Sequence, residues 1–291
     1  MISESAPAKI NLALHVTGQR EDGYHLLDSL VTFADRGDTL IALNAEADRF
    51  TISGPFSAPL VSETDNLVTR ARDTLRAAIL AASGVAPPVA LHLEKNLPIA
   101  SGIGGGSADA AATLRAQSRL WQSPLPAEAL ARIGLSLGAD VSMCLEGRPL
   151  IARGIGENLS PVASLPALAL LLVNPLKPVS TPEIFRRLTR RDNPPMSDVP
   201  SRFSLPEWSE FLAGQRNDLE AAARQLVPDI SRILTLLNLT GAQLARMSGS
   251  GATCFGLFET IEAARAAERN LKAAQPDWYV QAVTTISGDR Q

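Results

Sequence analysis

The chain has 291 residues, of which 45% are hydrophobic and 20% charged, and its formal net charge is −3. The length favours two domains, the composition is that of an ordinary globular protein, and the slight acidity gives no electrostatic reason to bind nucleic acid. No apolar run is long enough to cross a bilayer, and the first residues lack the basic and apolar regions of a signal peptide. We therefore expect a cytoplasmic protein with no membrane or nucleic-acid partner.

The two cysteines, Cys144 and Cys254, stand far apart among apolar neighbours. Their spacing does not match a metal site, and three histidines without an H-x-x-H pattern argue against a zinc enzyme. Buried free thiols in a reducing compartment are the expectation.

The first half of the chain contains both kinds of periodicity. Residues 9–16, KINLALHV, alternate with period two and predict a strand, and the following EDGYH predicts a turn at Asp22-Gly23. Residues 27–43 predict two strands joined around Arg36-Gly37. Helical spacing then predicts a helix over 66–83, with Asp65 or Asn66 as its cap. A strand over 88–98, a helix over 107–120 and a helix over 126–137 follow.

The second half is less regular. The apolar run 167–173 predicts a buried strand, and the proline-rich stretch 192–206 predicts a loop. Helices are expected at 217–225, 228–238 and 260–274, and strands around 247–258 and 277–286. Strands and helices alternate irregularly with antiparallel hairpins, which favours the α+β class. We place the domain boundary near residue 160, giving domains 1–160 and 161–291.

Residues 97–114, LPIASGIGGGSADAAATL, run from a strand through a glycine-rich loop into a helix. The loop has no lysine, so it is not a P-loop, and Ser107 stands where a dinucleotide-binding fingerprint needs its third glycine. The remaining functional interpretation is a loop whose N–H groups hold phosphates, with Ser101 and Ser107 as hydroxyl donors. A flexible linker or a tight packing turn is the structural alternative.

Three further features allow a structural and a functional interpretation. Lys9 begins the first strand and could be an exposed strand-end lysine. Asp140 follows the predicted helix end at Gly138 and could cap the next turn. The SGSG sequence at 248–251 could be a β-turn or bulge instead of a ligand contact. The basic cluster at 185–191 is typical of a solvated helix face.

Taken together, PAKINLALHVTGQREDGYHLLDSL, LPIASGIGGGSADAAATL and MSGSGATCFGLF resemble the three motifs of the GHMP small-molecule kinases. GADVSMC and RNDLE (216–220) also resemble blocks of that family. The likeness runs in order from residue 6 to about residue 258. The first motif is similar to the branch of the family that serves non-mevalonate isoprenoid synthesis, whose substrate carries a cytidine diphosphate group.

The resemblance implies a two-domain α+β fold with the active site in the cleft. Its N-terminal ATP domain would be like domain 2 of ribosomal protein S5, with a left-handed βαβ unit, and its C-terminal domain would be a ferredoxin-like α/β sandwich. It also implies transfer of a phosphoryl group from ATP, with Mg²⁺, to a tertiary hydroxyl. We expect a monomer or a weak homodimer with a small-molecule substrate.

The resemblance also implies site residues. Lys9 and Asp140 would be the catalytic pair, with Asp140 as general base. The substrate would be bound by Asn11 near the reacting hydroxyl, by stacking on Tyr24 and Phe185, by the edge contacts of His25, and by Thr181. The ATP phosphates would be wrapped by Pro98, Ile99, Ala100, Ser101, Gly102, Ile103, Gly104, Gly105, Gly106, Ser107 and Ala108. Ala108 stands where a second serine is common in the family, so no metal ligand is assigned.

Three alternatives stay open at this point. One is another member of the same family: a mevalonate, phosphomevalonate or homoserine kinase, or the related ATP-dependent decarboxylase. The second is a module that binds ATP without catalysis, and the third is a nicotinamide enzyme that uses the GIGGG loop. An assay of ADP release separates the first two, and dehydrogenase activity would identify the third.

Overall fold

The computed structural model describes residues 1–60, 65–201 and 204–289. Within it the chain packs as two compact units, and each is described by itself. Unit 1 consists of residues 1–8, 36–99 and 104–147, and unit 2 consists of residues 9–35, 100–103 and 148–291. The first two strands and the glycine loop are thus divided between the units.

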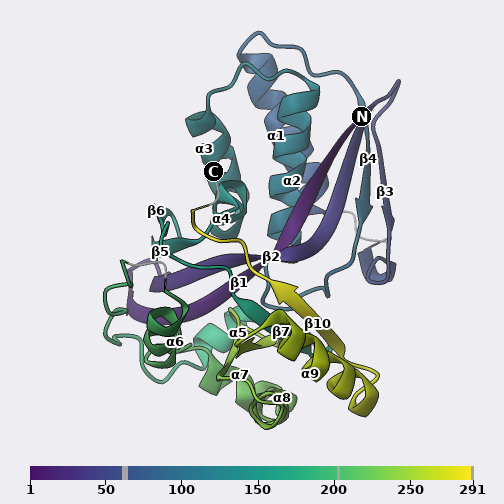
Figure 1. The fold of residues 1–291 in the computed structure, drawn as a ribbon. Coiled ribbons are helices and arrows are strands. Elements are labelled where there is room, and N and C mark those ends of the chain that lie inside the picture. The colour runs from purple at the N-terminus through teal and green to yellow at the C-terminus, as the bar shows by residue number, and fades with distance from the viewer. Residues whose placement is uncertain (61–64, 202–203, 290–291) are drawn as a thin grey trace. The chain divides into compact units, whose positions relative to one another are not determined.

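Unit 1 combines antiparallel and parallel strand pairs with a group of packed helices (Figure 1). The end of β2, residues 39–44, pairs antiparallel with β4, and β4 pairs parallel with β3. The strands that contribute to the unit are β1 (Ile2–Gln19), β2 (His25–Asn44), β3 (Arg49–Ser53) and β4 (Val89–Glu94). The helices are η1 (Ala58–Leu60), α1 (Leu67–Ala81), α2 (Gly105–Leu120), α3 (Ala127–Leu137) and α4 (Ala139–Glu146).

Helix α1 illustrates how local sequence sets these elements. The Asn66 side chain caps the helix by accepting a hydrogen bond from Val68 N at 2.9 Å. The side chains that α1 buries recur every three or four residues, the spacing of one helix face: Val68, Ala71, Leu75 and Ile79. The predicted helix and its cap are therefore confirmed.

The prediction of two strands over 27–43 is wrong, because β2 is one continuous strand from His25 to Asn44. Gly37, which suggested a turn, is extended. A Cβ atom at Gly37 would lie 2.1 Å from the carbonyl oxygen of Ala6. The glycine therefore permits a close approach of the neighbouring strand β1.

Unit 2 is built around an antiparallel sheet in the order β10-β7-β9-β8. Helices α8 and α9 pack against this sheet (Figure 1). The hairpin of β5 (Leu150–Gly154) and β6 (Asn158–Pro161) pairs with residues 27–31 of β2. The sheet strands are β7 (Ala169–Asn174), β8 (Leu244–Met247), β9 (Cys254–Phe258) and β10 (Tyr279–Thr284). The helices are α5 (Thr181–Arg186), α6 (Leu205–Ala213), α7 (Glu220–Leu226), α8 (Asp229–Leu239) and α9 (Ile261–Ala274).

Most of the predicted elements are confirmed, while β3, η1, α4, α5, α6 and the β5–β6 hairpin escaped prediction. The predicted loop over 192–206 holds as far as residue 201, residues 202–203 lie outside the described residues, and α6 begins at Leu205. Both cysteines are buried thiols, as expected. Among the described residues no helix combines the length and apolarity required to cross a membrane.

Candidate functional site

Lys9 is buried in unit 2, with 4% of its surface exposed, so the exposed strand-end interpretation is wrong. Its Nζ donates a hydrogen bond to Asn11 Oδ1 at 3.1 Å. Asn11 Nδ2 in turn donates to Ser29 Oγ on β2 at 2.8 Å. A lysine is rarely buried without partners, and these hydrogen bonds help to compensate for the burial of the amine. Ser29 was not singled out from the sequence.

The strand that carries Lys9 is hydrogen-bonded to the glycine loop. Lys9 N donates to the carbonyl oxygen of Ile103 at 2.9 Å. Two residues further along the strand, Asn11 N donates to Ser248 Oγ at 3.1 Å, and Ser248 Oγ donates to the carbonyl oxygen of Gly102 at 3.0 Å. Residues 102 and 103 of the loop are thereby fixed to β1.

The SGSG loop acts here as a bridge between β1 and the glycine loop. Besides the Ser248 contacts, Thr253 N donates to the carbonyl oxygen of Ser101 at 3.0 Å. A Cβ atom at Gly102 would lie 2.6 Å from the carbonyl oxygens of Ser248 and Gly251, and Gly102 has a φ of +76°. Gly102 is therefore required by the packing of the two loops.

The RNDLE block supports the same bridge. Asn217 Nδ2 donates to the carbonyl oxygens of Met247 and Gly249, each at 2.8 Å. Val16 N donates to Asp218 Oδ2 at 2.7 Å, which connects the block to β1. The block thus holds the SGSG loop and the first strand together in unit 2.

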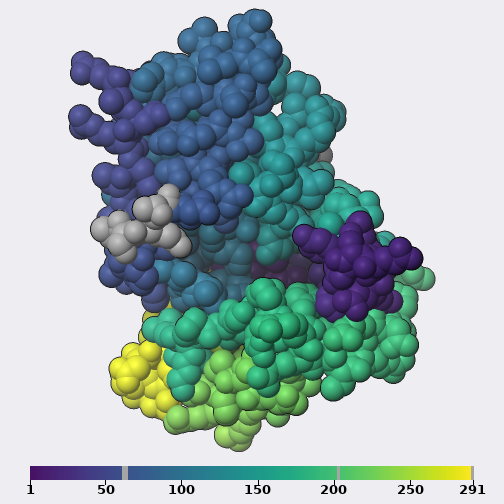
Figure 2. Space-filling view, turned by 180° about the vertical axis from the view of Figure 1, so that it is seen from behind, coloured from purple at the N-terminus to yellow at the C-terminus, as the bar shows by residue number. Residues whose placement is uncertain are grey.

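The residues expected to bind a nucleoside come together from two elements of unit 2. The rings of His25, at the start of β2, and Phe185, in α5, are stacked with centroids 4.7 Å apart and planes inclined by 26°. In the same unit, Thr181 and Ser250 share a hydrogen bond of 2.7 Å between their hydroxyls. Tyr24 does not join the stack and is 61% exposed. Figure 2 shows the β1–β2 hairpin, in purple, against the green surface of the segment that follows α5.

One ring nitrogen of His25 has an unused hydrogen-bonding capacity. Its Nε2 is buried and has no hydrogen-bond partner among the described residues. Burial, and secondarily the positive charge of Arg191, lower the pKa of His25 below its ordinary value. The ring is therefore neutral near pH 7, with one donor and one acceptor nitrogen. A neutral ring of this kind suits the polar edge of a base.

In unit 1 the glycine loop opens helix α2. Gly104 is the N-cap, in the left-handed region with φ of +64°, and no side chain caps the helix. The Ala108 N–H is already bonded to the Gly104 carbonyl oxygen at 2.8 Å. The first-turn N–H groups of Gly105, Gly106 and Ser107 are the ones that a helix leaves for an external acceptor such as phosphate.

The two central glycines of this turn have different surroundings. A Cβ atom at Gly105 would lie 3.0 Å from Lys95 Nζ, which is itself held by two carboxylates. Gly106 is exposed, and the nearest atom to a Cβ there is Leu67 Cδ1 at an ordinary 3.6 Å. Packing within the unit thus explains the first glycine but not the second.

We expect Gly106→Ala to keep or raise the melting temperature, since alanine favours the helix, while raising KM for ATP about tenfold by obstructing the phosphate. The matched variant Gly105→Ala is expected to lower the melting temperature by several degrees, because the Lys95 amine cannot withdraw. Thermal melts and ATP titration of both variants measure these effects. Equal destabilisation by the two variants would contradict the assignment.

Beneath this turn lies a buried cluster of three charged groups. Lys95 Nζ donates to Asp38 Oδ2 and, at 2.8 Å, to Asp109 Oδ2 on α2. Asp38 Oδ1 also accepts from Leu97 N at 2.8 Å, whereas Asp109 Oδ1 is buried without a partner among the described residues. Burial is the main cause that raises the pKa of Asp109 to about 7, and the nearby Asp38 adds to it.

This pKa predicts a pH-dependent stability. Between about pH 4 and pH 7 the folded chain holds a proton on Asp109 that the unfolded chain has lost, so the free energy of unfolding falls as pH rises through that window. Asp109→Asn removes the effect and should melt several degrees higher than the parent at pH 8, about half as much higher at pH 5.5, and close to it at pH 4. The exposed Asp277→Asn is the control. A difference that does not change with pH would contradict the prediction.

Asp140 belongs to unit 1, where it lies half-buried in the first turn of α4. The N-cap of α4 is Gly138, and no side chain caps the helix. The interpretation of Asp140 as a helix cap is therefore wrong. Lys9 belongs to unit 2, and the expected pairing of these two residues stays a prediction.

The described residues offer little to a metal ion. They contain no group of three or more His, Cys, Asp or Glu side chains that could hold one. Mg²⁺ is commonly bound by substrate phosphates, water and one or two carboxylates, so a dedicated cage is not required. The part of the chain that the structure describes therefore gives no ligand set for the metal.

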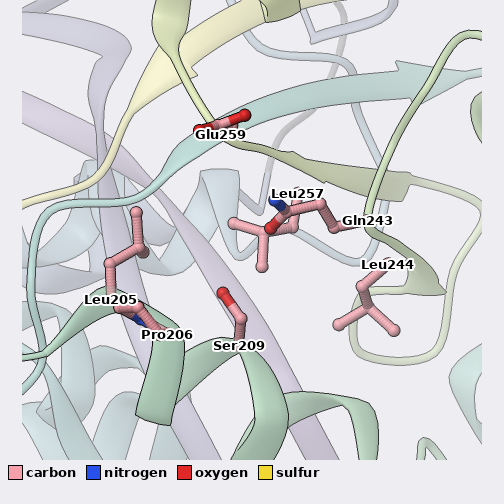
Figure 3. Close-up of a pocket in the computed structure, with 7 residues that line it drawn as sticks. All are labelled: Leu205, Pro206, Ser209, Gln243, Leu244, Leu257 and Glu259. Atoms are coloured by element: carbon pink, nitrogen blue, oxygen red, sulfur yellow. The ribbon is translucent and has the colours of Figure 1, made fainter.

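A cavity of about 330 Å³ lies apart from these residues within unit 2 (Figure 3). The start of α6 and the strands β8 and β9 line it, and Glu259 is the charged side chain among those labelled. None of the expected site residues lines it. The basic cluster is a solvated face, as expected, since Arg186 and Arg187 pair with Glu183 and Arg190 pairs with Asp192.

The comparisons with known proteins agree with these observations. The model of the GHMP kinases N terminal domain matches residues 66–148, and that of the GHMP kinases C terminal matches residues 203–277. A relative from Rhizobium johnstonii, named 4-diphosphocytidyl-2-C-methyl-D-erythritol kinase, is 61% identical over 99% of this chain and 94% of its own length. A relative of the same name from Agrobacterium fabrum is 56% identical over 97% of this chain and 96% of its own length.

Solved structures extend the likeness to the fold. The crystal structure of a 4-(cytidine 5'-diphospho)-2C-methyl-D-erythritol kinase is 32% identical and matches with a TM-score of 0.81, covering 99% of this chain and all of that one. A mevalonate kinase from L. major, 17% identical with a TM-score of 0.69, shares the fold over the full length of this chain and 97% of its own. The two-domain α+β fold is thus confirmed, and the chain is a small-molecule kinase that belongs to the GHMP kinase family.

Proposed function

We propose that this kinase phosphorylates the 2-hydroxyl of 4-diphosphocytidyl-2-C-methyl-D-erythritol with ATP, in the non-mevalonate route to isopentenyl diphosphate. The observation that carries the proposal is the buried Lys9, whose side chain is held by Asn11 and whose backbone is bonded to the glycine loop. The amine lies on the strand segment that is hydrogen-bonded to the glycine loop, which we propose holds the ATP phosphates. The relatives that are 61% and 56% identical carry the name of this kinase.

In the proposed mechanism, catalysis depends on positioning and charge stabilisation, because phosphoryl transfer needs little covalent help. The N–H groups at the start of α2 hold the ATP phosphates. Asp140 accepts the proton of the tertiary hydroxyl as general base. Lys9 neutralises the charge that develops on that oxygen, and Asn11 keeps the amine in place.

The cytidine group is proposed to bind at the His25–Phe185 pair. The flat rings offer a surface on which the base can stack, and Tyr24, the residue before His25, is proposed to add to it. The unpartnered His25 Nε2 offers a polar contact to the edge of the base. Thr181, the first residue of α5, would hold the polar tail of the substrate. The chain is proposed to act as a monomer or weak homodimer in the cytoplasm.

The proposal is tested by incubating the full chain with ATP, Mg²⁺ and 4-diphosphocytidyl-2-C-methyl-D-erythritol and measuring ADP release and the phosphorylated product. Stoichiometric ADP and a monophosphorylated product at the 2-hydroxyl are expected. ATP binding without any ADP release would instead indicate a module that binds ATP without catalysis.

A further inference from the structure

Ser29 lies on β2 with 2% of its surface exposed, in contact with the side chain that holds Lys9. Its Oγ donates a hydrogen bond to the carbonyl oxygen of Ala13 at 2.7 Å. The same Oγ accepts from Asn11 Nδ2 at 2.8 Å. A chain of hydrogen bonds therefore runs from the Ala13 backbone through Ser29 and Asn11 to the amine of Lys9.

The chemistry of the end groups fixes the direction of this chain. A backbone carbonyl only accepts, so Ser29 must use its single O–H hydrogen on Ala13. Ser29 can then only accept from Asn11, which must present its NH₂ group to the serine. The amide oxygen of Asn11 is consequently turned to Lys9, whose amine donates to it. The orientation of the Asn11 amide thus follows from the position of Ser29.

We propose that Ser29 is a positioning residue for phosphoryl transfer, acting through Asn11 to hold Lys9 Nζ at the reacting oxygen. The inference rests on the proposed function, in which Lys9 stabilises the charge on that oxygen. Without the hydroxyl, the Asn11 NH₂ group is buried without a partner, and the amide is free to rotate. Lys9 Nζ then loses the fixed Asn11 oxygen to which it donates, while the glycine loop keeps its own bond to β1 through Ile103.

The test measures kcat and both KM values for Ser29→Ala, Lys9→Met and the double variant, with ATP, Mg²⁺ and the cytidine substrate. Ser29→Ala is expected to lower kcat about tenfold and to leave both KM values within about twofold. Lys9→Met should lower kcat by about 10²-fold or more. The double variant should match Lys9→Met within about twofold, because a residue that acts through Lys9 has no effect once Lys9 is gone.

Thr32→Val is the matched control. Thr32 lies on the same strand, is fully buried, and its hydroxyl has no partner among the described residues. This variant should keep the kcat of the parent, and melting temperatures confirm that all variants are folded. Unchanged kcat in Ser29→Ala, or a double variant about tenfold slower than Lys9→Met, would overturn the inference. A parent chain that does not turn over the cytidine substrate would instead refute the proposed function.

Discussion

Replacing Asp140 with alanine is expected to lower kcat by about 10²-fold or more, equivalent to about 2.7 kcal/mol of transition-state stabilisation, while ATP binds nearly as before. The reason is that the reacting group of the proposed substrate is a tertiary hydroxyl, a hindered nucleophile with a high pKa that needs a base to accept its proton. Asp140 does not cap α4, so the substitution removes no helix cap. Steady-state ADP release and ATP titration measure the two quantities.

Glu128→Ala is the matched control for this experiment. Glu128 is an exposed acidic residue in the first turn of α3, the helix before α4. An acidic side chain near a helix N-terminus stabilises the helix by about 0.3–1 kcal/mol, and both substitutions remove such a side chain. Only Asp140 is proposed to act as a base. Turnover near that of the parent in Asp140→Ala would refute its role. Equal losses of turnover in both variants would indicate an effect on folding.

Replacing Phe185 with alanine is expected to raise KM for the cytidine substrate about tenfold to a hundredfold, because stacking of one base on an aromatic ring contributes about 1–3 kcal/mol. KM for ATP should stay unchanged, since the glycine loop that is proposed to hold the phosphates does not include α5. Kinetics with each substrate varied in turn separate the two effects.

Phe185→Leu distinguishes the ring from the apolar volume, because Phe185 also packs against the buried core of unit 2. Phe185→Ala also removes packing and is expected to lower the melting temperature. If the base stacks on the ring, Phe185→Leu has the melting temperature of the parent but keeps the raised KM. If Phe185 acts only through packing, leucine restores both, and the proposed cytidine site is wrong.

The same kinetics with a uridine analogue test His25, because a mispaired polar group costs about 1–3 kcal/mol when buried.

The sequence predicted those elements whose pattern is local. Helix α1 was found together with its Asn66 cap because cap and apolar spacing lie within one stretch of chain. Gly37 led to the incorrect prediction of a turn, because a glycine beside a charged residue looks the same in the sequence whether it forms a turn or permits two strands to approach closely. Only the partner strand, 31 residues away in sequence at Ala6, distinguishes the two. Short helices such as α5 and α6 contain too few turns to display a period.

The candidate site was predictable to the extent that it consists of motifs. Lys9, the glycine loop and the SGSG loop were identified as chemistry-bearing from the sequence, and the family of the chain followed from them. The hydroxyl of Ser29 and the Asp38–Lys95–Asp109 cluster were not found, because the bonded residues are 14 to 57 positions apart in the sequence and meet only through folding. A serine in a strand carries no signal that it fixes the amide of Asn11 on the neighbouring strand β1.

The central claim is that this kinase acts on a cytidine diphosphate derivative of methylerythritol. The most direct measurement compares ADP release with ATP and Mg²⁺ on four acceptors: 4-diphosphocytidyl-2-C-methyl-D-erythritol, its uridine analogue, mevalonate and homoserine. We expect turnover with the first, at least about tenfold lower kcat/KM with the second, and none with the last two. Turnover of mevalonate or homoserine alone, or equal kcat/KM for the cytidine and uridine compounds, would contradict the claim.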